Sequence, residues 1–197
     1  MIRPNYLKEG ATVAIVSTAR RISKKELIPA ITILKKRGLK VVLGTSIGAE
    51  DHQFAGNDEL RTSDFQTMLD HPEIDAIWCA RGGYGTVRII DQLDFSNFKN
   101  YPKWIIGYSD ITVLHAHLHQ LGIETLHAQM PLFIETKSDA TINSINETLF
   151  GEKYEIIIPS EKNNINGIAS GQLIGGNLSI LYSLCGSPSA LNTKGKI

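Results

Sequence analysis

The sequence has no excess of charge of either sign and no long apolar run. Lys and Arg together number 20, and so do Asp and Glu, so the 197 residues carry a formal net charge of zero. Without a basic excess, neither nucleic acid nor an anionic membrane surface is favoured as a partner. No run approaches the roughly 18 apolar residues of a membrane span, and the opening residues "MIRPNYLKEG" hold no apolar signal region. We therefore expect a cytoplasmic protein.

Cysteine is also scarce, with only Cys79 and Cys185 in the chain. Both lie inside apolar runs, "IDAIWCA" and "ILYSLCG", and they form no CxxC pair. We expect reduced core residues, not a disulfide or a metal site. Apolar residues make up 42% of the chain and glycines number 17, as in an ordinary globular protein. The length suits one well-buried domain, or one domain and part of another.

Short apolar runs alternate with amphipathic stretches along most of the chain. This alternation indicates β–α–β units, so we predict an α/β fold with a mostly parallel sheet flanked by helices. Ser23 (with Glu26 in the capping-box position) and Asn57 are the expected caps of two helices. The expected strands cover residues 12–17, 39–44, 74–80, 103–108 and 154–159, and the expected helices cover 23–38, 57–72, 86–94, 110–122 and 138–151.

The regular alternation gives way to a polar loop, "EKNNINGIASG", after the last predicted helix. We therefore expect an N-terminal α/β domain over residues 1–155 and the beginning of a C-terminal domain over 168–197. The final residues "LNTKGKI" turn toward an apolar run without completing it. On this basis we expect the second domain to be cut short.

The stretch "KWIIGYSDITVLH" places Ser109 at a tight turn between a strand and a helix. Such a turn is the geometry of a nucleophile elbow, which exposes the serine Oγ. The N–H groups of the following helix then face a developing oxyanion. The usual GxSxG pattern is only half matched, because Ile111 stands in its fifth position. Ser and Asp are also favoured helix caps, and spacing alone favours this second interpretation.

A glycine-rich turn, "RGGYG" at residues 81–85, ends the third predicted strand. Its unobstructed backbone N–H groups suit an oxyanion or a phosphate. The competing interpretation is a tight turn that needs positive φ, which is the more frequent reason for such glycines. The turn does not match GxGxxG, so a dinucleotide site has little support.

Histidines follow the predicted elbow. His115 and His119 share one helix face, but without a third ligand or a nearby Glu they are poor candidates for a metal site. A nucleophilic serine needs a base that a third group orients. The histidines of the helix, including His117, lead away from the elbow, so His127 is the one plausible base in the chain. Asn177 in "GGNLSIL" is expected to cap a helix.

Four blocks, "ARGGYG" with "RIIDQLDF", "IIGYSDITVLH", "HAQMP" and "GQLIGGNLSIL", occur in this order. At these spacings they resemble the LD-carboxypeptidase family of serine peptidases, which also contains microcin-immunity proteins. The resemblance runs from about Thr12 to the last residue. It implies that Ser109 is the nucleophile and that the backbone N–H groups of Gly83 and Asp110 form the oxyanion hole. Asn177 would border the site without a chemical role.

The same resemblance implies a function. The family's peptidoglycan members remove a terminal D-alanine from the L-centre of diaminopimelate in cytoplasmic muropeptides, and others hydrolyse a peptide–nucleotide antibiotic. It implies no metal or organic cofactor, a small peptide substrate and a homodimer. The family's catalytic Glu and His have no counterpart in this sequence, so we expect little activity from this chain alone. A non-catalytic module that binds peptide carboxylates is the alternative from a different class.

Overall fold

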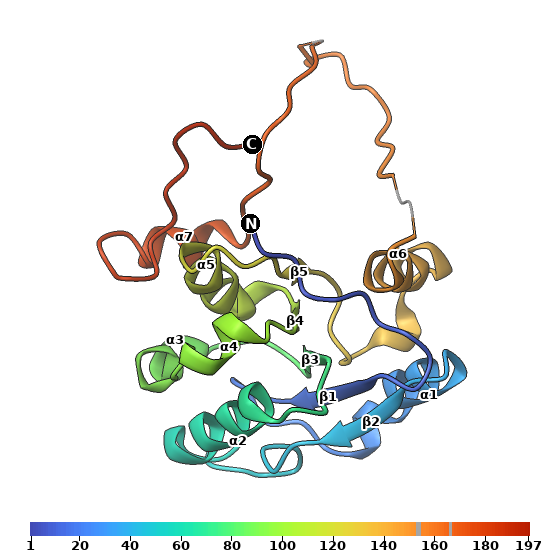
Figure 1. Cartoon of the computed structure of the whole chain (residues 1–197), viewed down its shortest axis with the longest axis vertical. Helices are drawn as coiled ribbons and strands as arrows, with labels where there is room; N and C mark the ends of the chain where they lie inside the picture. Colours follow the sequence, from blue (N-terminus) through green and yellow to red (C-terminus); the bar gives the residue numbers. More distant parts are fainter. Residues whose placement is uncertain (153–154, 166) are drawn as a thin grey trace.

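The computed structural model describes residues 1–152, 155–165 and 167–197 and contains one five-stranded sheet. All its strand pairs are parallel, and the strand order is β2-β1-β3-β4-β5 (Figure 1). The predicted α/β fold is therefore confirmed. The strands are β1 (Thr12–Val16), β2 (Lys40–Leu43), β3 (Ala76–Cys79), β4 (Trp104–Gly107) and β5 (Leu126–His127).

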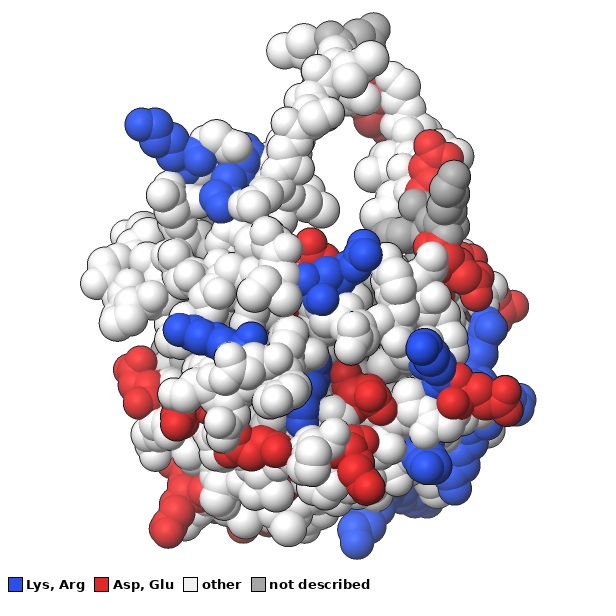
Figure 2. All heavy atoms as spheres, viewed as in Figure 1, with Lys and Arg blue, Asp and Glu red and all other residues white. Residues whose placement is uncertain are grey.

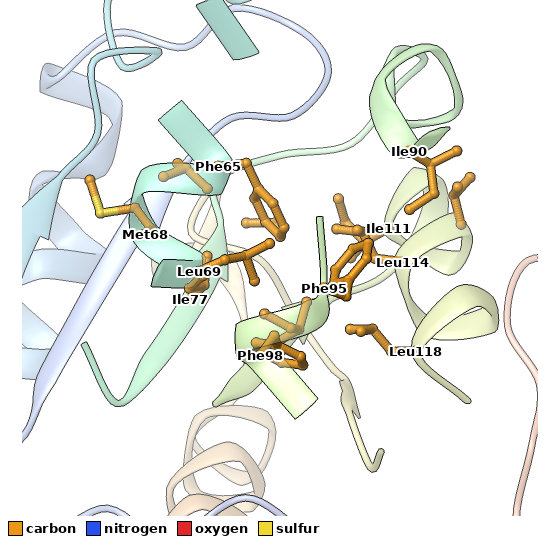
Figure 3. Close-up of a cluster of buried hydrophobic side chains, with 14 of the residues drawn as sticks. Phe65, Met68, Leu69, Ile77, Ile90, Phe95, Phe98, Ile111, Leu114 and Leu118 are labelled. Carbon is orange, nitrogen blue, oxygen red and sulfur yellow. The ribbon is translucent and has the colours of Figure 1, made fainter. Parts of the chain in front are cut away.

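The central strands are apolar on both faces because helices cover both sides of the sheet. Alternate residues of β1 separate accordingly: Ala14 and Val16 join one core cluster, and Val13 and Ile15 join the other. The first cluster lies against α2, α4 and α5, and Figure 3 shows its larger side chains. The second lies against α1 and α6, on the opposite face (Figure 1).

The predicted helices form with shorter bounds, and α4 (Ser96–Asn100) is an additional helix that the sequence pattern did not predict. The helix expected over 23–38 begins as a 3-10 turn, η1 (Lys25–Leu27), because Pro29 lacks an N–H and favours the first turn of α1. The helices are α1 (Ile28–Lys36), α2 (Asp58–Asp70), α3 (Thr86–Ile89), α4 (Ser96–Asn100), α5 (Thr112–Gln120), α6 (Asp139–Phe150) and α7 (Leu178–Ser183), with the further 3-10 turns η2 (Ile90–Gln92), η3 (Ser109–Ile111) and η4 (Ile134–Thr136).

Three predicted caps form as expected. Asn57 Oδ1 accepts from Leu60 N at 2.8 Å, and Asn177 Oδ1 accepts from Ile180 N at 3.1 Å. The Ser23 backbone N–H donates to the Glu26 carboxylate at 2.8 Å. In return, the Glu26 N–H donates to Ser23 Oγ at 3.4 Å, which completes the capping box.

The strand expected over 154–159 is wrong for the residues that the structure describes. Glu155–Pro159 carry no regular structure, and Tyr154 lies outside the described residues. A strand needs a partner for its backbone groups, and no described strand lies beside this segment. Ile157 is 81% exposed. Residues 155–165 and 167–175 extend away from the sheet and helices as an arch (Figures 1 and 2).

Both cysteines are free, but they differ in burial. Cys79 in β3 is buried, as predicted, whereas Cys185 is exposed, so its expected place in the core is wrong. Cys185 follows α7, which packs against α5 through other side chains, including the buried Leu184. None of the helices in the described part of the chain is long and apolar enough to cross a membrane.

Candidate active site

Ser109 lies two residues after the end of β4, at the carboxyl end of the sheet, in a conformation that is rare for its residue type. Its φ is +60°, in the left-handed region, where an L-residue pays about 1–2 kcal/mol. The preceding Tyr108 occupies the N-cap position of η3 and makes no side-chain capping bond. Ser109 Oγ itself makes no hydrogen bond with any described residue. A capping role does not account for this serine, since a cap has an extended backbone and accepts a backbone N–H.

The glycine turn after β3 lies against this corner. A Cβ added to Gly82 would be 3.4 Å from the Ser109 Cβ and 3.3 Å from the Asp110 backbone nitrogen. The turn can approach this closely because Gly82 has no side chain. Next to it, Gly83 has a φ of +120°, a conformation that favours glycine. The positive φ expected of this turn is therefore present, at Gly83 and Gly85.

Two backbone N–H groups beside Ser109 remain free. Within the described part of the chain, neither the Gly83 N–H nor the Asp110 N–H donates to a backbone or side-chain acceptor. Unpaired N–H groups of this kind are suited to an oxyanion, because they need no rearrangement when negative charge develops. Ser109, Asp110 and the glycine turn that contains Gly83, the groups that the family resemblance implies, thus lie at the carboxyl ends of the neighbouring strands β3 and β4.

The Asp110 side chain joins the elbow to the glycine turn. It is only 1% exposed, and its Oδ2 accepts a hydrogen bond from the Thr86 backbone N–H at 2.9 Å. Thr86 opens α3, directly after the turn, and its hydroxyl bonds that of Thr18 at 2.8 Å. The Asp110 carboxylate therefore contributes to the site in a way that the sequence did not indicate.

Arg61 of α2 is a further buried element of the same support. Arg61 is only 1% exposed. Its guanidinium donates to the carbonyls of Thr18 and Gly85, the latter at 3.0 Å. It also pairs with Asp58 of its own helix. Burial lowers the pKa of Arg61, and the Asp58 carboxylate opposes that effect. The sequence gives no indication of this role for Arg61 beyond its position on the apolar face of a predicted helix.

His115 of α5 supports the corner from the other side. Its Nε2–H donates to the Gly107 carbonyl at 2.9 Å, so Nδ1 accepts from the Thr125 hydroxyl at 2.8 Å. Burial lowers the pKa of His115 to about 4, with the Gly107 hydrogen bond opposing the change and His127 adding to it. The ring is therefore neutral and serves as a structural donor to the last residue of β4.

The other histidines take separate positions. The exposed His127 ring lies 6.3 Å from that of Tyr108, but His127 makes no hydrogen bond with Ser109. His117 bonds the Ser189 hydroxyl at 2.9 Å, and His119 accepts from Lys196 at 2.8 Å. In residues 1–152, 155–165 and 167–197, no three His, Cys, Asp or Glu side chains gather in a metal-binding arrangement.

The "GGN" turn also reaches the elbow helix. The Asn177 backbone N–H donates to the Thr112 hydroxyl at 3.0 Å, and a Cβ at Gly176 would lie 2.5 Å from Thr112 Cγ2. Thr112 is the first residue of α5, three positions after Ser109. The turn therefore borders the candidate site, while Asn177 itself caps α7.

A comparison with protein families gives one match. A family model described as the LD-carboxypeptidase N-terminal domain matches residues 13–128, which include Ser109 and both free N–H groups.

Curated relatives agree with this match. The chain is 35% identical over 208 aligned residues to the "Probable murein peptide carboxypeptidase" of Bacillus subtilis, covering 99% of this chain and 63% of the relative. It is 28% identical to the microcin self-immunity protein MccF of Escherichia coli, covering 94% of this chain and 65% of that protein. The chain thus spans a little under two thirds of the length of these relatives.

Solved structures share the fold. A muramoyltetrapeptide carboxypeptidase from Oxalobacter formigenes superposes with a TM-score of 0.79 at 27% identity, over 92% of this chain and 62% of that one. A MccF-like protein from Bacillus anthracis superposes with a TM-score of 0.87 at 23% identity, over 100% of this chain and 68% of that one.

Proposed function

The chain belongs to the LD-carboxypeptidase family, and we propose that Ser109 is the nucleophile of a serine carboxypeptidase. The proposed reaction is hydrolysis of the amide bond before a C-terminal D-amino acid in a muropeptide. Ser109 Oγ attacks the carbonyl carbon, and the Gly83 and Asp110 N–H groups bind the resulting oxyanion. The names of the murein peptide carboxypeptidase of Bacillus subtilis and the muramoyltetrapeptide carboxypeptidase of Oxalobacter formigenes support this substrate class.

One observation carries the proposal: Ser109 has a φ of +60° and an Oγ without a partner among the described residues, beside two free N–H groups. A strained backbone conformation at a serine persists only where the surrounding structure enforces it. Such conformations cluster at functional sites. Here Gly82 and Asp110 provide the enforcing contacts. A purely structural turn would not require a serine at this corner, since glycine would adopt the same φ without strain.

The proposed base is a Glu–His pair outside these residues. Within the described part of the chain, no His, Asp or Glu side chain forms a hydrogen bond with Ser109 Oγ. A serine without a base is a weak nucleophile at neutral pH. We therefore propose that these 197 residues alone hydrolyse a D-alanine-terminated tetrapeptide slowly. Turnover by this chain at the rate of a complete family member would contradict this point.

A serine-reactive fluorophosphonate tests the nucleophile directly. We expect the full-length protein to be labelled once, at Ser109, as read by peptide mass spectrometry. Ser109→Ala should abolish labelling and tetrapeptide hydrolysis, whereas the control Ser63→Ala, on the exposed face of α2, should leave both unchanged. Labelling that persists in Ser109→Ala would remove this residue from the proposed role. Absence of labelling in the unmodified protein would favour the non-catalytic binding module.

A second candidate is cleavage of a peptide–nucleotide conjugate. The 28% identity to the microcin self-immunity protein MccF is the observation that favours it. Competing the tetrapeptide against an aminoacyl-sulfamoyl nucleoside in the same hydrolysis assay distinguishes the two substrates. A preference for the nucleoside conjugate would replace the muropeptide in the proposal.

The cellular setting follows the family resemblance. We place the reaction in the cytoplasm and propose a homodimer, and we retain the division into a nucleophile domain over 1–155 and the beginning of a second domain over 168–197. Sedimentation of the full-length protein tests the dimer, and a monomeric mass at micromolar concentration would contradict it.

A further inference from the structure

Arg20 lies at the point where the strand order of the sheet reverses. The chain moves from β1 to β2 on one side and then returns to β3 on the other side of β1. In open parallel sheets, ligands bind in the crevice outside the carboxyl ends of the strands at this switch point. Arg20 follows the end of β1, and Gly83 follows the end of β3. The two residues therefore lie at the carboxyl ends of adjacent strands, at this switch point.

The backbone at Arg20 is held from three directions. The Ser17 hydroxyl donates to the Arg20 carbonyl at 2.6 Å, and the Arg21 N–H donates to the Gln53 carbonyl at 3.0 Å. The Arg81 guanidinium donates to the Arg21 carbonyl at 3.0 Å, which ties this loop to the first residue of "RGGYG". The position of Arg20 relative to the glycine turn is thus set before any ligand binds.

The Arg20 side chain packs on the glycine turn itself. A Cβ at Gly83 would lie 2.7 Å from Arg20 Cδ and 2.9 Å from Arg20 Nε. A Cβ at Gly82, one residue earlier, would lie 3.4 Å from the Ser109 Cβ. Arg20 and Ser109 therefore contact adjacent residues of one short turn.

The Arg20 guanidinium has no partner of opposite charge among the described residues, although neighbouring arginines do. Arg21 pairs with Glu50 at 2.7 Å, and Arg88 pairs with Asp58 at 2.6 Å. Arg20 is exposed and forms neither an ion pair nor a side-chain hydrogen bond there. Arg81 adds a second positive charge beside it, and Glu26 is the acidic side chain that faces Arg81. Beside the glycine turn that contacts Ser109, Arg20 therefore carries a positive charge without an acidic partner among the described residues.

We propose that Arg20 binds the free terminal carboxylate of the peptide whose last amide bond Ser109 attacks. This inference rests on the proposed carboxypeptidase function and names the residue that would make the site specific for the chain end. The terminal carboxylate belongs to the residue directly after the attacked carbonyl, and consecutive Cα atoms are about 3.8 Å apart. Its receptor must therefore lie next to the oxyanion site, as Arg20 does through Gly83. A guanidinium is suited to this task because its planar donors match the two oxygens of a carboxylate.

Binding to a Ser109→Ala form of the full-length protein tests this assignment without hydrolysis. The probes are N-acetyl-L-alanyl-D-alanine and its C-terminal carboxamide, measured by isothermal titration calorimetry. We expect Arg20→Gln to weaken binding of the carboxylate about 10- to 100-fold, the usual effect of losing one charge-assisted hydrogen bond. Binding of the carboxamide should not change.

Arg21→Gln is the matched control, since it removes an adjacent guanidinium that is already paired with Glu50. It should leave the preference for the carboxylate intact. The assignment is overturned if Arg20→Gln leaves the carboxylate affinity unchanged, or if it weakens both probes equally, because the residue would then act on the fold and not on the charge.

Hydrolysis by the protein with Ser109 intact reports on the proposed function separately. A carboxylate preference that depends on Arg20, in a protein that neither reacts with fluorophosphonate nor turns over a tetrapeptide, would contradict the carboxypeptidase while supporting the binding site. Turnover that depends on Ser109 but is equal for Arg20→Gln and the unmodified protein would support the carboxypeptidase and contradict the carboxylate site at Arg20.

Discussion

The carboxylate of Asp110 accepts a hydrogen bond from the backbone N–H of Thr86 at 2.9 Å, in the interior of the protein. Asp110, directly after Ser109, therefore binds Thr86, directly after the "RGGYG" turn. This contact links the two loops that supply the free N–H groups, so their relative position does not depend on either loop alone. Preorganised donors are effective because no reorganisation is needed when charge develops.

Replacing Asp110 by Ala should weaken both the fold and the site. The Thr86 N–H would lose its acceptor in a buried position, which costs about 1–3 kcal/mol of the free energy of unfolding. Urea denaturation measures this change, and fluorophosphonate labelling of Ser109 should slow in parallel. The control Asp91→Ala, at an exposed position of η2, should change stability by less than about 0.5 kcal/mol. Equal stabilities for the two variants would show that the Asp110 contact contributes little.

The left-handed backbone at Ser109 predicts an unusual response to glycine. Ser109→Gly should be about 1 kcal/mol more stable than Ser109→Ala, because glycine adopts a φ of +60° without the Cβ clash. At Ser63, within α2, the order should reverse, since glycine is unfavourable in a helix by a similar amount. Thermal denaturation of the four variants measures both differences. If alanine were the better residue at both positions, the backbone at Ser109 would not be strained.

His115 should make stability depend on pH. The folded protein keeps this ring neutral until the pH approaches its pKa of about 4, whereas the unfolded chain takes up the proton near 6.5. The unfolded state therefore binds more protons in this window. The free energy of unfolding should fall as the pH falls from 6.5 toward 4, by up to about 3 kcal/mol.

Urea denaturation at a series of pH values measures this dependence. His115→Gln removes the titrating ring, so the variant should show a smaller loss of stability between pH 6.5 and 4 than the unmodified protein. Identical pH profiles for the two proteins would mean that His115 is protonated equally in the folded and unfolded states.

The two thiols should differ in reactivity. Burial raises the pKa of Cys79, and the nearby Asp110 carboxylate adds to the effect, so its reactive thiolate form is suppressed. Cys185 is exposed. We expect an aromatic disulfide reagent to modify one thiol rapidly in the native protein and the second only after denaturation. Cys185→Ser should abolish the rapid phase, and a rapid phase that survives this substitution would contradict the burial of Cys79.

Local patterns in the sequence predicted the parts of the fold that depend on neighbouring residues. The four strands from β1 to β4 follow from apolar runs, and the caps Asn57 and Asn177 follow from side chains that bond a backbone N–H three residues on. The strand expected over 154–159 failed because apolar content does not provide a partner strand. Cys185 failed for a related reason, since an apolar run does not tell which of its residues faces the core.

The contacts that support the candidate site could not be predicted, because they join distant segments. Arg61 reaches Thr18 and Gly85 across 43 and 24 positions of the chain. His115 reaches back to Gly107, although its sequence pattern raised only a metal site, for which it was a poor candidate. Such contacts are set by how helices lie on the sheet, which the period of the apolar residues leaves open.

The Gly107 carbonyl accepts from both His115 Nε2 at 2.9 Å and the Ala128 backbone N–H at 3.0 Å. Both donors come later in the chain than the corner that they hold. During ribosomal synthesis, these two hydrogen bonds can therefore both form only after residue 128 has left the exit tunnel. The contacts of the corner with Gly82 and Thr86 involve residues that are translated earlier, so the support from the C-terminal side is added last.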